Sequence, residues 1–326
     1  MPKRVVCWEL GPPECLRLET FASAPLEPGQ VRVAVRAAGI NFLDILMVAG
    51  QYQLKPELPF TPGVEAAGEV SELGDGIAGV EVGDRVMVKM RYGAYADEVV
   101  VGPSQLTALP SNFDFAEGAT FLAAHGTAHH ALVDRGALEP DEVLLVHGAG
   151  GGVGLAAVEV GRLLGATVIA AASSEEKLAI AKARGADHLV LFGREPFRDA
   201  VKRITDGRGA DVVFDPVGGE VFENSLRCIA FGARILVIGF TGGIGLARTN
   251  LLLIKGASVL GVRAGEAGRR NPALAEARTA ALLRWVEAGK VRPHISHRLP
   301  LEDCAQAMRL LIDRKAIGRV ALMMSA

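Results

Sequence analysis

A glycine-rich turn between an apolar strand and a helix constrains the fold of this chain more than any other feature. The apolar run 143–147 leads directly into Gly148-Ala149-Gly150-Gly151-Gly152-Val153-Gly154, and a helical pattern follows over 153–164. This order points the free N–H groups and the positive dipole end of the helix at a phosphate. An ordinary tight turn is the alternative for the bare pattern, but the flanking strand and helix favour a dinucleotide site. We expect the pyrophosphate to be held by Gly148, Gly150, Gly151, Gly152 and Val153.

The second half of the chain alternates short apolar runs with helical patterns, as βαβ units require. The predicted strands are 143–147, 167–171, 188–191, 211–214, 234–238 and 258–262. The predicted helices between them are 153–164, 175–184, 196–205 and 220–230. Six such strands predict a doubly wound, parallel Rossmann sheet.

The first half has a different texture. Roughly the first 120 residues carry short β-like segments broken by Gly and Pro, such as 31–35, 84–88 and 98–101, which indicate a mostly antiparallel β domain. After the last Rossmann strand we expect a polar turn at 266–272, helices at 272–288 and 301–313, and a strand at 318–323 that rejoins the first domain. The predicted domains are therefore 1–122 with 266–326, and 123–265.

Composition excludes several classes of function. The formal net charge is −2, which leaves no basic footprint for nucleic acid, and no apolar run approaches the ~20 residues of a membrane span. The N-terminal residues show no secretory signal pattern. Cys7, Cys15, Cys228 and Cys304 share no metal-ligand or disulfide spacing. We expect a cytoplasmic protein with reduced thiols and no membrane or nucleic-acid partner.

The end of the second strand indicates which dinucleotide binds. NAD enzymes place an acidic side chain there for the ribose 2′-hydroxyl, whereas this chain has Ala171-Ala172-Ser173-Ser174, with Lys177 one helical turn further on. Hydroxyls and a cation suit a 2′-phosphate, which favours NADPH. Alternatively, Ser173 and Glu176 form a capping box and Lys177 is only solvated. Both interpretations can hold together, because they use the same helix end.

Several motifs in order resemble the medium-chain dehydrogenase/reductase family. They are Ala37-Ala38-Gly39-Ile40-Asn41-Phe42-Leu43-Asp44, Gly50-Gln51-Tyr52, Pro59-Phe60-Thr61-Pro62-Gly63-Val64-Glu65-Ala66-Ala67-Gly68, Gly83-Asp84-Arg85-Val86, Asp215-Pro216-Val217-Gly218-Gly219 and Gly239-Phe240. The glycine turn has the GAxGGVG form of the quinone oxidoreductase branch. The resemblance covers nearly the whole chain and implies a GroES-like, mostly-β catalytic domain beside the Rossmann domain.

The resemblance also implies that zinc is absent. Asn41 and Val64 stand where zinc alcohol dehydrogenases of the family have a cysteine and a histidine, and neither side chain can build that site. The interval 88–109 has no cysteine for a structural zinc lobe. A rival metal site would use His125 and His129, four residues apart, with His130 adjacent. We expect instead a packed or cleft-lining helix there, because no carboxylate or cysteine stands at a supporting spacing.

In the family the nicotinamide lies in the cleft between the domains, beside residues that match Asn41, Asp44, Thr127, Gly218, Phe240 and Thr241. The resemblance implies that Asn41 and Thr127 orient the cofactor and that Asp44 shapes the cleft, whereas a plain helix cap is the alternative for Asn41. Arg319 replaces a lysine of the family. Phe192 stands where many relatives have a tyrosine near the 2′-phosphate, so either Arg194 compensates or the preference for NADPH is weaker.

These features together predict an NADPH-dependent reductase that transfers hydride to a quinone or an electron-poor C=C bond. Tyr52 is the candidate proton donor, with water as the alternative. An acyl-thioester enoyl reductase, and a relative that binds NADPH or RNA without catalysis, remain open. The resemblance implies a homodimer in which the strand 258–262 pairs with its copy across a two-fold axis.

Overall fold

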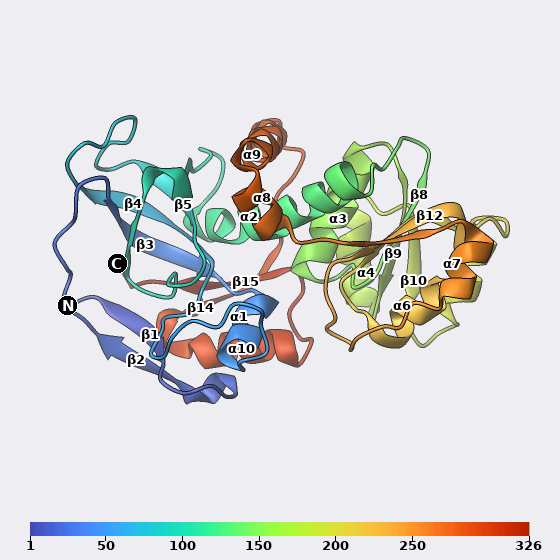
Figure 1. The fold of residues 1–326 in the computed structure, drawn as a ribbon, viewed down its shortest axis with the longest axis horizontal. Coiled ribbons are helices and arrows are strands. Elements are labelled where there is room, and N and C mark those ends of the chain that lie inside the picture. Colours follow the sequence, from blue (N-terminus) through green and yellow to red (C-terminus); the bar gives the residue numbers. More distant parts are fainter. Residues whose placement is uncertain (326) are drawn as a thin grey trace. The chain divides into compact units, whose positions relative to one another are not determined.

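A computed structural model describes residues 1–325 and divides the chain into two compact units (Figure 1). Unit 1 is Met1–Ala123 with Pro293–Ala326, and unit 2 is Ala124–Arg292. The segment 266–292 therefore groups with unit 2 by its contacts, whereas the sequence prediction assigned it to the first domain. Within unit 2, the His129 ring lies 5.6 Å from the Trp285 ring, which ties this segment to the helix that precedes the Rossmann strands.

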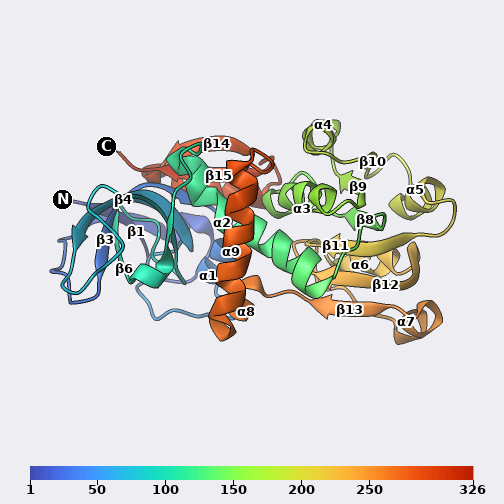
Figure 2. The ribbon, with the colours of Figure 1, turned by 90° about the horizontal axis from the view of Figure 1, so that it is seen from above.

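Unit 2 is built on a parallel six-stranded sheet with the order β10-β9-β8-β11-β12-β13. The strands are β8 (Val143–Val146), β9 (Thr167–Ala172), β10 (His188–Leu191), β11 (Ala210–Asp215), β12 (Ile229–Val237) and β13 (Ser258–Gly261). This order is that of a doubly wound Rossmann sheet, and Figure 2 shows the strands following one another in it. The predicted fold class of this half is confirmed.

Helices cover both faces of this sheet because its strands are apolar on both sides. Leu144 and Val146 of β8 pack in a core with α3 (Gly152–Leu163) and α4 (Glu175–Ala183). Leu145, which points to the opposite face, packs in a second core with α5 (Phe197–Ile204), α6 (Gly219–Ser225) and α7 (Thr249–Lys255). The remaining helical elements are α2 (Phe115–His129), which begins in unit 1, a π-helical turn (His130–Arg135), α8 (Ala264–Arg270) and α9 (Pro272–Glu287).

Two sequence predictions in unit 2 were wrong in detail. Helix α6 ends at Ser225 rather than at residue 230, because Ile229 and Ala230 already belong to β12 and are buried in the sheet. The predicted polar turn at 266–272 is mostly the helix α8. Glu266 accepts hydrogen bonds from Arg269 and Arg270, three and four residues on, and such pairs stabilise a helical turn.

Unit 1 is a β structure with two small helices. Its main sheet has the order β14-β15-β3-β4-β5-β7, with β6 paired to β3, and only the pair of β14 and β15 is parallel. These strands are β3 (Val31–Gly39), β4 (Glu65–Leu73), β5 (Arg85–Lys89), β6 (Glu98–Val101), β7 (Leu106–Ala108), β14 (Ile295–Pro300) and β15 (Arg319–Met323). The prediction that the C-terminal strand rejoins the first domain is confirmed, because β15 pairs with β3.

A separate hairpin and the two helices complete unit 1. The hairpin pairs β1 (Lys3–Cys7) with β2 (Leu16–Thr20), and the helices are α1 (Phe42–Val48) and α10 (Cys304–Ile312). Short 3-10 turns occur at Pro13–Cys15, Pro103–Gln105 and Leu301–Asp303. Across residues 1–325, no helix is long and apolar enough to span a membrane.

Candidate functional site

The glycine turn lies where the strand order of the Rossmann sheet reverses. β8 is flanked by β9 on one side and by β11 on the other, and such a switch point is where parallel sheets of this type bind ligands. Helix α3 begins at Gly152, after Gly151 in extended conformation. A Cβ at Gly154 would fall 2.2 Å from the Gly148 carbonyl oxygen, so only glycine lets α3 approach the turn this closely. The predicted turn and helix are thus in place.

Lys177 lies across this turn from the next helix. A Cβ at Gly150 would fall 2.6 Å from the Lys177 Cβ and Cγ atoms, so the lysine stem occupies the space that the glycine leaves. The Lys177 Nζ atom donates to the Ser173 Oγ atom at 3.4 Å. The N-cap of α4 is Ser174, whose Oγ atom accepts from the Lys177 backbone N–H, so the alternative interpretation of a capping box from Ser173 to Glu176 is wrong. Ser173 is left to face the lysine ammonium.

The loops after β11 and β12 bring three further predicted residues together. The Asp215 Oδ1 atom accepts from the backbone N–H groups of Val217 and Gly218, which fixes the loop after β11. Gly218 has φ +74°, and a Cβ there would fall 3.2 Å from the Phe240 Cα atom. Thr241 donates through its backbone N–H and its hydroxyl to the Pro216 carbonyl oxygen. Gly218, Phe240 and Thr241 therefore form one wall beside the switch point.

The end of β10 is aromatic. Phe192 stacks on the His147 ring at 6.0 Å and meets Phe197 edge-on at 5.7 Å. His147 is fully buried, and burial lowers its pKa to about 3, so this ring is neutral. Its Nε2 atom lies 2.8 Å from the Ser225 Oγ atom. Phe192 is thus part of a neutral apolar cluster, and its role in cofactor binding stays a prediction.

His125 of α2 and His130 of the π-helical turn have separate partners rather than a common centre. The His125 Nε2 atom lies 2.9 Å from the Glu159 Oε2 atom, and Arg184 binds the other oxygen of the same carboxylate at 2.6 Å. His130 lies 2.7 Å from Asp134. Across residues 1–325, no group of three or more His, Cys, Asp or Glu side chains is arranged to hold a metal ion. Thr127, on the same helix, is half-buried.

A buried polar cluster in unit 1 contains two of the predicted residues. The Arg319 guanidinium donates to the Asn41 Oδ1 atom at 3.0 Å and to the Glu65 carboxylate. The Asn41 amide also donates to the Glu65 Oε1 atom at 3.0 Å, and Glu65 accepts the Ala123 N–H through its other oxygen. Asn41 is the N-cap residue of α1, but its amide spans Glu65 and Arg319 rather than capping the helix. This arrangement fixes the amide in one orientation.

Asp44 extends this cluster into the core of unit 1. Its Oδ2 atom accepts the Asn41 backbone N–H at 2.9 Å and the Tyr95 hydroxyl at 2.7 Å. Within the described residues its Oδ1 atom is buried without a partner. Burial raises the pKa of Asp44 to about 7, against the hydrogen bonds, which act to lower it. Tyr95 is fully buried and its pKa is raised well above its ordinary value by burial.

The remaining predicted residue of unit 1 is Tyr52. It lies in the loop after α1, is partly buried, and packs on the core of unit 1, while its backbone N–H donates to the Leu46 carbonyl oxygen. The structure therefore joins Asn41, Asp44 and Arg319 in one network and leaves Tyr52 outside its hydrogen bonds. Sequence reasoning missed the parts played by Glu65 and Tyr95. The charge of Glu65 amid apolar residues was the available signal for one, and nothing in the sequence singled out the other.

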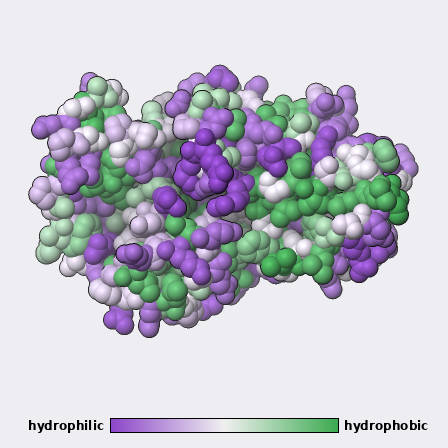
Figure 3. Space-filling model, in the orientation of Figure 1, coloured by the Kyte–Doolittle hydropathy of each residue, from purple (hydrophilic) through white to green (hydrophobic). Residues whose placement is uncertain are grey.

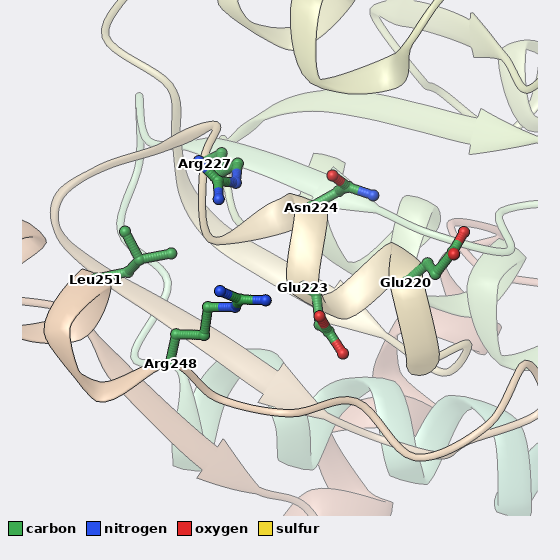
Figure 4. Close-up of a pocket in the computed structure, with 6 residues that line it drawn as sticks. All are labelled: Glu220, Glu223, Asn224, Arg227, Arg248 and Leu251. Atoms are coloured by element: carbon green, nitrogen blue, oxygen red, sulfur yellow. The ribbon is translucent and has the colours of Figure 1, made fainter.

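A polar hollow of about 280 Å³ lies on another part of unit 2 (Figure 4). Its walls come from α6 and the segment that leads into α7, and the lining residues are Glu220, Glu223, Asn224, Arg227, Arg248 and Leu251. Acidic and basic side chains share these walls, so the hollow has no single sign of charge. None of the predicted site residues lines it.

Comparisons with known proteins agree with this geometry. Residues 27–133 match the alcohol dehydrogenase GroES-like domain, and residues 152–281 match the zinc-binding dehydrogenases. A quinone oxidoreductase-like protein 2 homolog of Nematostella vectensis is 38% identical over 98% of this chain and 88% of its own length. The quinone oxidoreductase of Sus scrofa is 31% identical, over 97% of this chain and 96% of the relative. The solved quinone oxidoreductase of Escherichia coli in complex with NADPH has a TM-score of 0.89 and 28% identity, and the match covers 98% and 99% of the two chains.

Proposed function

Because this chain belongs to the medium-chain dehydrogenase/reductase family, in its quinone oxidoreductase branch, we propose that it is an NADPH-dependent reductase of quinones or electron-poor C=C bonds that needs no zinc. The observation that carries the proposal is the glycine turn with the Lys177 stem across it. When bound, NADPH would supply the hydride from C4 of its nicotinamide ring.

The residues of the turn fit this cofactor. The first N–H groups of α3 suit the pyrophosphate, because they lie at the positive end of the helix dipole and the surrounding glycines leave room for a close approach. Lys177 and Ser173 provide a cation and a hydroxyl at the end of β9, which suits a 2′-phosphate. We place Thr127, Gly218, Phe240 and Thr241 around the nicotinamide end.

Asn41 supports a reaction without zinc. An amide cannot replace a thiolate ligand, and both polar atoms of this amide are hydrogen-bonded to Glu65 and Arg319. Glu65 in turn pairs with Arg319, which neutralises its charge. We propose that Asn41 orients the nicotinamide ribose, and that Asp44 is a positioning residue that holds the backbone at Asn41.

The test is oxidation of NADPH and NADH by the metal-chelated protein with para-quinones, α,β-unsaturated ketones and enoyl thioesters as acceptors. We expect NADPH turnover that survives chelation. Lys177→Met should raise the KM for NADPH about tenfold, the loss of one charge-assisted hydrogen bond, with a smaller effect on NADH. Lys182→Met is the matched control, because Lys182 lies on the same helix and binds the Asp187 carbonyl oxygen. Activity lost on chelation, or equal effects on both cofactors, would contradict the proposal.

We further propose that the protein is a homodimer formed along β13. This strand ends the sheet order, so its outer edge offers unpaired backbone groups, which a monomer would need to protect. Phe231, Leu253 and Ile254 are 82%, 84% and 67% exposed on β12 and α7, and Figure 3 shows hydrophobic surface in this region. Leu253→Glu should shift the mass in solution from dimer to monomer, and Val82→Glu, an exposed site in unit 1, should not. A monomeric wild-type protein would contradict the proposal.

A further inference from the structure

The thiols of Cys7 and Cys15 donate to the same backbone oxygen. The Sγ atom of each lies 3.2 Å from the Glu9 carbonyl oxygen, so the two sulfurs are no farther apart than the sum of these distances. Both cysteines are free thiols. Side-chain rotation can bring two thiols that share one acceptor to the bonding distance of about 2.05 Å.

The strand pairing places the two backbones at a suitable spacing as well. Cys7 is the last residue of β1, and its partner across the antiparallel hairpin is Leu16. Cys15 precedes Leu16 directly, at the end of the 3-10 turn Pro13–Cys15. Residues opposite each other in such a pair have Cα atoms about 4.5–5.5 Å apart. Cys15, one residue from the partner of Cys7, therefore lies near the Cα–Cα separation that a disulfide bridges.

The two thiols differ in access. Cys7 is fully buried, whereas Cys15 is partly exposed. Burial raises the pKa of Cys7 to about 12. Burial also raises the pKa of Cys15, and the hydrogen bond with Cys7 opposes that rise. Cys15 is therefore the sulfur that a reagent from solvent meets first, and Cys7 is placed to react second.

We propose that Cys7 and Cys15 are a redox-active pair that a small-molecule disulfide converts to an intramolecular disulfide. The Cys15 thiolate attacks one sulfur of the reagent, forms a mixed disulfide and releases one small thiol. The Cys7 thiolate then attacks the Cys15 sulfur, forms the Cys7–Cys15 bond and releases the second small thiol. The pair loses two electrons and two protons, and the reagent gains them as two thiols.

Formation of this disulfide would change the conformation of the loop between the two cysteines. Glu9 loses the two donors that hold its carbonyl group, and residues 8–14 must readjust. The Gly11 N–H donates to the Val48 carbonyl oxygen, and Leu10 lies against Gly50, where a Cβ would fall 2.8 Å from the Leu10 Cδ1 atom. Gly50 precedes the loop of Tyr52. Oxidation therefore alters the support of that loop, a consequence that rests on the proposed function.

The test uses the full-length protein and oxidised glutathione at alkaline pH, where more of each thiol ionises. After alkylation of remaining thiols, peptides are mapped without reduction. We expect a linked pair of peptides containing Cys7 and Cys15. Cys7→Ala, which keeps the buried site apolar, should instead retain glutathione on Cys15, with about tenfold more mixed disulfide than the wild type. Cys228→Ala, a buried cysteine in unit 2, should leave the linkage unchanged.

A wild-type protein that retains glutathione on Cys15, or in which neither thiol reacts, would overturn the proposal. The disulfide is detected by the mass of the linked peptides, so this test of the proposal does not depend on any enzymatic activity. If NADPH turnover is found, oxidation should change it in the wild type, a dithiol reductant should reverse the change, and Cys7→Ala should show none. Linkage without that effect on turnover would refute the coupling to the Tyr52 loop.

Discussion

Replacing Asp44 with asparagine should remove a pH dependence from the stability of unit 1. The carboxyl group is fully buried, and its Oδ2 atom accepts the Asn41 N–H and the Tyr95 hydroxyl, while burial raises its pKa from 3.8 to about 7. At a pH between these two pKa values, the carboxyl group of the native state is therefore protonated, whereas that of the unfolded chain is ionised. Asparagine has the shape of the protonated acid and keeps an oxygen for both donors, so it mimics the native form at low pH.

The sign and size of the effect follow from proton linkage. Between about pH 4 and pH 7 the native state binds more protons at Asp44 than the unfolded state, so the free energy of unfolding falls as the pH rises. Below this window both states are protonated, and above it both are ionised, so the curve is flat there. Three pKa units correspond to about 4 kcal/mol, an upper limit of the loss by pH 8. In Asp44→Asn that loss is absent.

The assay is urea unfolding from pH 4 to pH 8 in a Trp285→Phe background, where Trp8 is the remaining tryptophan and reports on unit 1. We expect the variant to gain stability over its parent progressively as the pH rises through the window. Glu302→Gln is the control with opposite sign, since Lys3 lowers the pKa of Glu302 and the stability from this pair is lost on acidification. A difference between Asp44→Asn and its parent that is constant with pH, or that shrinks as pH rises, would refute a protonated Asp44.

Four further substitutions test the nucleotide site and its acceptor side. Gly154→Ala should abolish NADPH binding in a fluorescence titration, because its Cβ would fall 2.2 Å from a backbone oxygen, whereas Gly150→Ala should lower affinity by less, because there the lysine stem can move. Phe192→Tyr should lower the KM for NADPH relative to NADH, since it adds a donor at the end of β10; an unchanged ratio would place the residue away from the 2′-phosphate. Tyr52→Phe should reduce kcat about a hundredfold if its hydroxyl donates the proton, and an unchanged kcat would assign that role to water.

The Rossmann half was predictable because its signals are local. The strands carry short apolar runs, as Val143–Val146 does in β8, and α4 carries its own start at Ser174. The glycine turn could also be placed on the sheet, since a strand that runs into a helix of this kind occupies the switch point in a parallel sheet. Helix α6 was predicted too long, because the buried start of β12 follows it. Helix α8 was predicted as a turn, although the ion pairs of Glu266 favour a helix, and α7 was not predicted.

The polar cluster of unit 1 was only half predictable, because its members are joined by tertiary contacts. Asn41 and Arg319 are 278 positions apart, and they meet because β15 returns to pair with β3 at Gly39. The sequence marks each as polar within an apolar stretch but does not tell that Glu65 lies between them. Tyr95 was missed because a tyrosine in a loop reads as surface, and only the packed core shows its hydroxyl on Asp44.

Burial explains why this cluster needs all of its members. A guanidinium inside a protein is stable when its charge is paired and its donors are used, and Glu65 meets the first need while Asn41 helps with the second. Removing Glu65 would leave the buried Arg319 charge uncompensated, and removing Asn41 would leave a buried Arg319 donor without its acceptor. Among residues 1–325, no cation is in direct hydrogen-bond contact with Asp44, and burial raises its pKa. The same network thus contains a compensated charge and a carboxyl group whose pKa burial raises to about 7, so the protonation of this carboxyl group changes near neutral pH.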